Sequence, residues 1–182
     1  MLGGSIDLAG WQPLALPLAG EARDATRDDA QRAYAALIDA RAARVHALTA
    51  LAAQHGVELA ADDASARLGA WLVAAAAAAG PDAIGAAAWS GLAVDATLWL
   101  GERIIAASDG ALRWELYTAH KKATGYQRAV LVGFRGVDDP RYYVDLAHFV
   151  ASWLELALRR RPARPDFLAV IERTTLADAR PR

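Results

Sequence analysis

Apolar residues recur at intervals of three and four between residues 24 and 55, which predicts an amphipathic helix over this range. The residues on the apolar stripe are Tyr34, Leu37, Ile38, Val45, Leu48 and Ala52. The preceding residues, 1–23, contain two prolines and several glycines, so we expect an irregular arm there.

Two further helices are expected in the N-terminal half of the chain. One begins at Asp62 or Asp63 and ends at Ala79, before a glycine and a proline. The other runs from about Pro81 to Ala107. Its segment from Trp89 to Ile105 is apolar on most of its circumference, which predicts a central buried helix around which the rest of the chain packs.

Beyond residue 110 the period changes to two, since Leu112, Trp114 and Leu116 alternate with polar side chains. This pattern predicts one strand over 112–118, and the apolar run 129–134 predicts a second, antiparallel strand. A sheet of two strands is marginal. We therefore expect either a third strand near residues 167–171 or close packing of helices on the pair.

A long amphipathic helix is predicted for residues 138–161, because two aspartates and Pro140 form a helix-start signal and Pro162 ends the apolar pattern. The fold class is therefore α+β, with this helix packed on a small antiparallel sheet. We expect one domain over residues 1–182, frayed over 175–182.

Charge and composition narrow the range of partners. The 182 residues include 20 Lys and Arg against 21 Asp and Glu, which gives a net charge of −1 and no general attraction to nucleic acid or to an anionic membrane. No cysteine is present, which excludes disulfides and thiolate chemistry, and no signal peptide or membrane span is expected. The alanine and arginine bias is typical of a bacterial genome rich in GC. We therefore expect a cytoplasmic bacterial protein.

Familiar catalytic and cofactor-binding motifs are absent from the sequence. It contains no G-x-G-x-x-G, no P-loop, no H-E-x-x-H and no G-x-S-x-G, and its four histidines are scattered. We therefore expect neither a bound cofactor nor a metal site.

Asp95 and Glu102 are the first candidates for a functional site. They lie seven residues apart on the predicted central helix, within about 20° of one line along it. If this line is buried, the carboxylates could act as general acid and base or form half of a metal site. If it faces solvent, they keep the helix soluble or bind arginines such as Arg103 or Arg113.

A basic loop between the two predicted strands is the second candidate. It carries His120, Lys121, Lys122, Tyr126 and Arg128, and its two lysines are the only ones in the chain. Such a group can hold a phosphate or an acidic surface through charge-assisted hydrogen bonds. A solvated hairpin loop would have the same composition.

The six tryptophans have both a structural and a functional interpretation. We expect the tryptophans to fill the core between alanine-rich helices, Trp114 and Trp153 above all, although several could line a pocket or an interface.

His148 also has two interpretations. Asp145 and Ser152 lie at helical spacing from it and could orient its imidazole. However, His148 lies on the polar stripe of its predicted helix, so we expect it to be an ordinary surface residue.

Two functions follow from these features. The favoured one is a non-catalytic protein that binds another protein, of a regulatory or immunity type, and it predicts an exposed apolar or aromatic patch. The alternative is a small-molecule-binding protein or a hydrolytic enzyme, in which Asp95 and Glu102 converge on a cavity with Arg113 or the basic loop nearby. A homodimer is compatible with either function.

Overall fold

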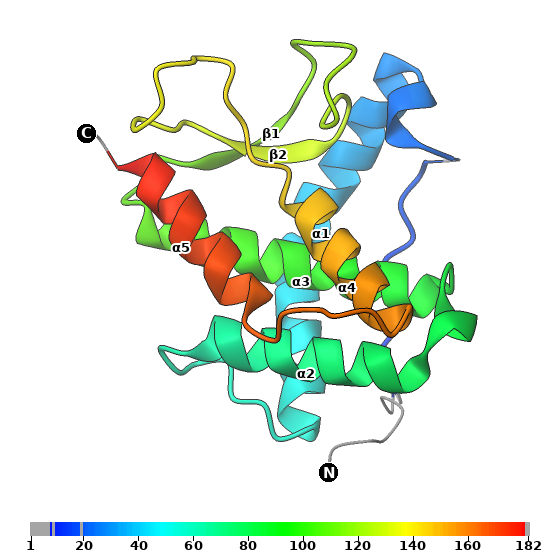
Figure 1. Cartoon of the computed structure of the whole chain (residues 1–182). Helices are drawn as coiled ribbons and strands as arrows, with labels where there is room; N and C mark the ends of the chain where they lie inside the picture. The colour runs from blue at the N-terminus through cyan, green and yellow to red at the C-terminus, as the bar shows by residue number, and fades with distance from the viewer. Residues whose placement is uncertain (1–7, 9, 19, 181–182) are drawn as a thin grey trace.

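The computed structural model describes residues 8, 10–18 and 20–180, and Figure 1 shows their arrangement. The regular elements, in chain order, are the helices α1 (Arg27–Gln54), α2 (Ala64–Ala79) and α3 (Ala87–Ala107), the strands β1 (Arg113–Leu116) and β2 (Ala129–Val132), and the helices α4 (Leu146–Leu158) and α5 (Phe167–Ala179). Two short 3-10 turns, η1 (Ala22–Asp24) and η2 (Pro81–Ala83), precede α1 and α3. The predicted α+β class is confirmed.

Helix α3 is the centre of the molecule, as predicted. It packs against α1 on one side and against α4 and α5 on another, and in Figure 1 it crosses the middle of the fold. Its side chains are buried along most of its length. The helix starts at Ala87 and not at Pro81, because Gly80 and Gly85 adopt positive φ angles and enclose the separate turn η2.

Strands β1 and β2 form the expected antiparallel hairpin, with Arg113 opposite Val132 and Leu116 opposite Ala129. On the other edge of β2, a single antiparallel bridge joins Leu131, which already pairs with Trp114 of β1, to Val144. The third strand expected near residues 167–171 is absent, since these residues begin α5. The alternative expectation holds: α4 packs against β2, and α1 packs against β1.

The helix predicted for residues 138–161 is shorter than expected. Helix α4 begins at Leu146, because Asp145 caps it by accepting a hydrogen bond from the backbone N–H of His148 at 3.0 Å. The residues before Asp145 form turns and the bridge to β2, so the aspartates before Pro140 do not start a helix. Phe149, an apolar residue of this helix, is 45% exposed.

The C-terminal helix is packed where fraying was expected. Helix α5 continues to Ala179, and the side chains of Thr175 and Ala179 are buried. The backbone N–H of Gly136 donates to the carbonyl of Asp178 at 2.9 Å, which fixes the last turn of the helix to the loop after β2. Residues 181–182 lie outside the described part of the chain.

A second hydrogen bond, from Tyr142 to Asp178, makes the attachment of the last turn of α5 sensitive to alkaline pH. Its hydroxyl donates to Asp178 Oδ2 at 2.9 Å, and burial together with this carboxylate raises the pKa of Tyr142 to about 12. An unfolded tyrosine loses its proton near pH 10, so the stabilisation is complete below pH 10 and is lost as the pH rises toward about 12.

We therefore expect the melting temperature to fall between pH 10 and pH 12, and to fall less steeply in Tyr142→Phe, which has no proton to lose. Melting curves of both proteins at several pH values, followed by circular dichroism, measure the difference. Parallel pH profiles for the two proteins would contradict the assignment.

Within the described ranges, no helix is long and apolar enough to cross a membrane.

Candidate functional site

An apolar pocket lies where α1, α3, the hairpin and the N-terminal arm meet. Its volume is about 180 Å³. An apolar cavity of roughly 150 Å³ is large enough to hold benzene. The lining residues are Leu16, Leu18, Ala22, Ala30, Ala33, Tyr34, Leu37, Val94, Thr97, Leu98, Trp114, Leu116, Gln127, Arg128, Ala129 and Ala147.

Small residues on α1 create the space. Ala30 and Ala33 are buried on the face of α1 that looks toward α3, where Val94 and Leu98 form the opposite wall. Alanine side chains end at Cβ, so the gap between the two helices is left open. The alanine-rich composition therefore produces a hollow here instead of a closed core.

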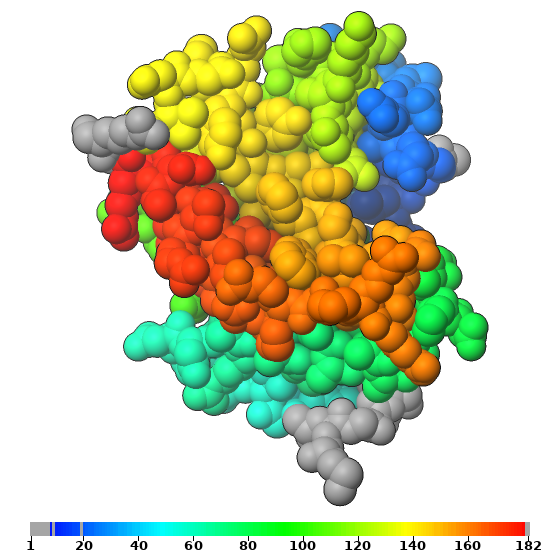
Figure 2. Space-filling model, in the orientation of Figure 1, coloured from blue at the N-terminus to red at the C-terminus, as the bar shows by residue number. Residues whose placement is uncertain are grey.

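The N-terminal arm contributes one wall of the pocket through Leu16 and Leu18. Gln127 holds the end of the arm, because its side-chain amide donates to the carbonyls of Ala22 at 2.8 Å and Ala25 at 3.0 Å. Gln127 is buried and has a φ of 59°, a left-handed conformation that is uncommon outside glycine. Figure 2 shows the arm and the start of α1, in blue, against the hairpin.

Thr97 is the polar exception on the α3 wall. Its side chain is buried, and its Oγ1 is the one buried side-chain polar atom without a hydrogen-bond partner in the described part of the chain. Thr97 also lines a second hollow, between α3 and α4, and this hollow shares Val94, Arg128 and Ala147 with the pocket. The two spaces therefore meet at Thr97.

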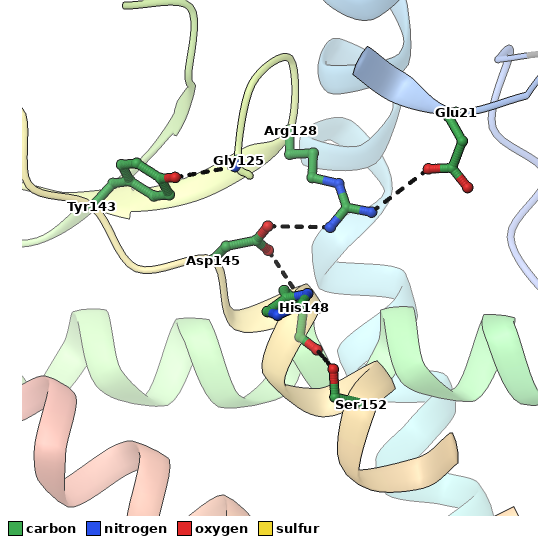
Figure 3. Close-up of polar contacts among 7 residues, drawn as sticks. All are labelled: Glu21, Gly125, Arg128, Tyr143, Asp145, His148 and Ser152. Carbon is green, nitrogen blue, oxygen red and sulfur yellow. Dashed lines mark hydrogen bonds and ion pairs between the residues drawn. The ribbon is translucent and has the colours of Figure 1, made fainter. Parts of the chain in front are cut away.

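Among the described residues, Arg128 is the one charged side chain that lines the pocket, and its charge is compensated. Its Nη1 lies 3.2 Å from Asp145 Oδ2, and its Nη2 lies 4.0 Å from the exposed carboxylate of Glu21 on the arm. Figure 3 shows the guanidinium between these two carboxylates. Burial raises the pKa of Tyr34, the other titratable side chain on the wall, above its ordinary value, which favours the protonated, uncharged hydroxyl.

The neighbourhood of His148 is a helix cap. Asp145 accepts from the backbone N–H of His148, and the Ser152 hydroxyl donates to the carbonyl of His148 at 2.7 Å (Figure 3). Both contacts involve the main chain, so neither orients the imidazole. His148 is exposed, as the sequence predicted.

Asp95 is fully buried, but it is occupied by structural partners. Its carboxylate accepts from the Trp11 indole at 2.8 Å and from two nitrogens of Arg44, at 2.8 Å and 2.5 Å. The Arg44 guanidinium also lies over the Trp11 ring, 5.3 Å from its centroid. This buried group joins the arm, α1 and α3.

Glu102 repeats this arrangement at a more exposed position. It accepts from the Trp114 indole at 2.9 Å, lies 3.6 Å from Nε of Arg41 on α1, and its side chain is 38% exposed. Asp95 and Glu102 thus bind separate tryptophans and arginines, and neither lines the pocket. The structure does not bring the two carboxylates together at one cavity.

The basic loop is likewise dispersed. His120, Lys121 and Lys122 are exposed and Tyr126 is half-buried, and none of them lines the pocket. Arg113 is exposed and pairs with Glu115 at 3.0 Å. Of the charged candidates and the residues of the basic loop, Arg128 alone reaches the pocket, and Trp114 is the one tryptophan among its lining residues.

Trp114 and Trp153, expected to be core residues, are both half-buried, whereas Trp11 and Trp99 are buried. Trp114 lies on a strand with a single partner, and its ring packs on Gly101 of α3 at the edge of the pocket. No local pattern in the sequence distinguishes the buried tryptophans from the half-buried ones.

Over the described residues, no three His, Asp or Glu side chains lie close enough together to hold a metal ion. No protein-family model matches the chain, no curated protein is similar to it, and no solved structure matches it.

Proposed function

We propose that this protein binds a small apolar molecule in the pocket between α1, α3 and the hairpin, and that it does so without catalysis. The observation that carries the proposal is the pocket itself, whose volume of about 180 Å³ is comparable to that of cavities that admit a single aromatic ring. Concave sites with mostly apolar walls and few polar groups are typical of small-molecule binding.

The composition of the pocket favours binding over hydrolysis. Its titratable side chains are Tyr34 and Arg128, and neither is a carboxylate or an imidazole. General acid and base catalysis requires a proton carrier within reach of the substrate. Asp95 and Glu102 are held by tryptophan and arginine partners away from this wall, so the proposal gives them no chemical role.

The surface provides less support for a protein-interaction function. Such a function predicts a contiguous exposed apolar patch. Among the described residues, the large apolar side chains exposed by more than a third are Ile84, at 37%, and Phe149, at 45%. They belong to the turn before α3 and to α4, and scattered single residues of this kind are ordinary.

Toluene tests the proposal, because it is apolar and has the size of one ring. We expect saturating toluene to raise the melting temperature of the full chain, since a ligand at ten times its Kd stabilises the folded state by about 1.4 kcal/mol. Ala33→Leu, which fills the pocket from α1, should abolish the increase.

Ala43→Leu is the matched control, because Ala43 lies on the same helix and is exposed. It should keep the response to toluene. Differential scanning calorimetry measures the three proteins, each with and without the probe. An equal response from all three proteins, or no response from the original chain, would refute the proposal.

A further inference from the structure

We propose that residues 14–18 of the N-terminal arm form a strap that opens to admit the ligand and then closes over it, and that Leu18 is the side chain that moves. This inference rests on the proposed function and adds the route by which a ligand reaches the pocket. Three features of the arm carry it: its two fixed ends, the apolar contacts between them, and a hollow beside Leu18.

The part of the arm before the strap is fixed to α3. Trp11 is buried, and its indole N–H donates to Asp95 at 2.8 Å. The arm also lies very close to Gly91 of α3, since a Cβ atom at that glycine would be 2.6 Å from Cβ of Pro13. These contacts hold the chain against the helix as far as Pro13.

The part of the arm after the strap is fixed to the hairpin. The side-chain amide of Gln127 donates to the carbonyls of Ala22 and Ala25 at 2.8 Å and 3.0 Å. The strap therefore lies between two attachments that are made by other residues of the arm. It can move outward without breaking either of them.

The strap itself is held by apolar contacts. Leu16 and Leu18 are half-buried in the wall of the pocket, whereas Ala15 and Pro17 are exposed. Among the described residues, the one hydrogen bond of the strap is internal, from the N–H of Leu18 to the carbonyl of Leu16 at 2.8 Å. Opening the strap therefore exposes some apolar surface but breaks no hydrogen bond to the helices or the hairpin.

A second hollow gives Leu18 a place to go. This hollow is lined by Pro17, Leu18, Ala25 and Asp29, and its volume is about 440 Å³. An apolar cavity of roughly 150 Å³ holds benzene, so the hollow has room for a leucine side chain. Leu18 lines both the hollow and the pocket. Its rotation into the hollow would open the pocket on this side.

Binding kinetics distinguish a strap that opens from a fixed wall. A residue that only touches the bound ligand affects dissociation, whereas a residue that must move before the ligand enters also affects association. Fluorobenzene is a suitable probe, because it is close to toluene in size and carries one fluorine. Exchange measurements by ¹⁹F NMR on the full chain give both rate constants.

In Leu18→Ala, the association rate constant of fluorobenzene should rise about fivefold, because the smaller side chain loses less apolar burial when the strap opens. The dissociation rate constant should rise at least as much. Leu18→Val, a milder change, should raise the association rate constant about twofold, and it tests the inference if the alanine variant fails to fold.

Leu37→Ala is the matched control. Leu37 is also a half-buried leucine that lines the pocket, but it belongs to helix α1 and not to the arm. Its replacement removes the same atoms from the wall. It should therefore raise the dissociation rate constant and leave the association rate constant unchanged.

The outcomes separate this inference from the proposed function. If fluorobenzene binds and the Leu18 variants leave its association rate constant unchanged, or if Leu37→Ala raises that constant as much as Leu18→Ala does, the strap is not the entry route and the pocket remains a binding site. If fluorobenzene does not bind to the original chain, both proposals fail.

Discussion

Replacing Asp95 with alanine should lower the free energy of unfolding by about 3–5 kcal/mol, because it leaves a buried charge and its neighbours without a partner. The carboxylate is fully buried and holds Arg44, whose side chain is 14% exposed, together with the indole N–H of Trp11. Alanine would leave the guanidinium and the indole unpaired at the junction of the arm, α1 and α3. Equilibrium denaturation in urea measures the loss.

Glu102→Ala is the matched comparison, because Glu102 makes the same two kinds of contact at a half-exposed position. We expect Glu102→Ala to lower the free energy of unfolding by about 1 kcal/mol. The hydrogen bond from the Trp114 indole accounts for most of this loss, because an exposed ion pair contributes little. Equal losses in the two variants would contradict the view that burial gives Asp95 its importance. A folded, fully stable Asp95→Ala protein would overturn the structural role assigned to this residue.

Gly101→Ala should destabilise the protein by about 2 kcal/mol, although alanine normally favours a helix over glycine by about 1 kcal/mol. A Cβ atom at this position would lie 2.0 Å from Cζ2 of Trp114, far inside van der Waals contact. The indole cannot move away freely, because its N–H is bonded to Glu102. The ring would have to leave the wall of the pocket.

Making Gly101→Ala in a protein that already carries Trp114→Leu tests whether the clash with the indole causes the loss of stability. Without the indole, Gly101→Ala should no longer destabilise the protein and should stabilise it by about 0.5–1 kcal/mol through helix propensity. Urea denaturation of the four proteins in this cycle gives the interaction energy between the two positions. The same cost of Gly101→Ala in both backgrounds would show that Trp114 is not responsible.

Local patterns in the sequence were sufficient for the first three helices and the hairpin. The apolar spacing of α1, the glycine and proline after Ala79, and the alternation around Trp114 each predicted an element that the structure contains. These signals work because each element buries one face against the same core, so local periodicity and tertiary packing agree.

The C-terminal third was predicted less well, for two physical reasons. Asp138, Asp139 and Asp145 are all acceptable helix caps by sequence, and only the tertiary pairing of Val144 with β2 decides that α4 starts after Asp145. The apolar run that begins at Phe167 is short enough to be a strand or a buried helix. Its continuation with Thr175 and Ala179 at helical spacing was the signal that favoured α5.

The pocket could not be predicted from the sequence. Its walls come from the arm, α1, α3, the hairpin and α4, and much of its space is left by alanines that have no distinctive pattern. Asp95 and Glu102 were conspicuous in the sequence because they interrupt an apolar helix. Their partners, Arg44 and Arg41, lie on α1 more than 50 residues earlier, and no local pattern joins them.

The attachments of the N-terminal arm also have a consequence for how the chain acquires its structure. Trp11 meets Asp95 across 84 positions, and Gln127 meets Ala22 and Ala25 across more than 100. Contacts at such separations carry a large loop-closure entropy, which is offset only after the intervening segments are already ordered. During synthesis the arm leaves the ribosome before Asp95 and Gln127 exist, so it can dock only after these anchoring residues have been made and positioned.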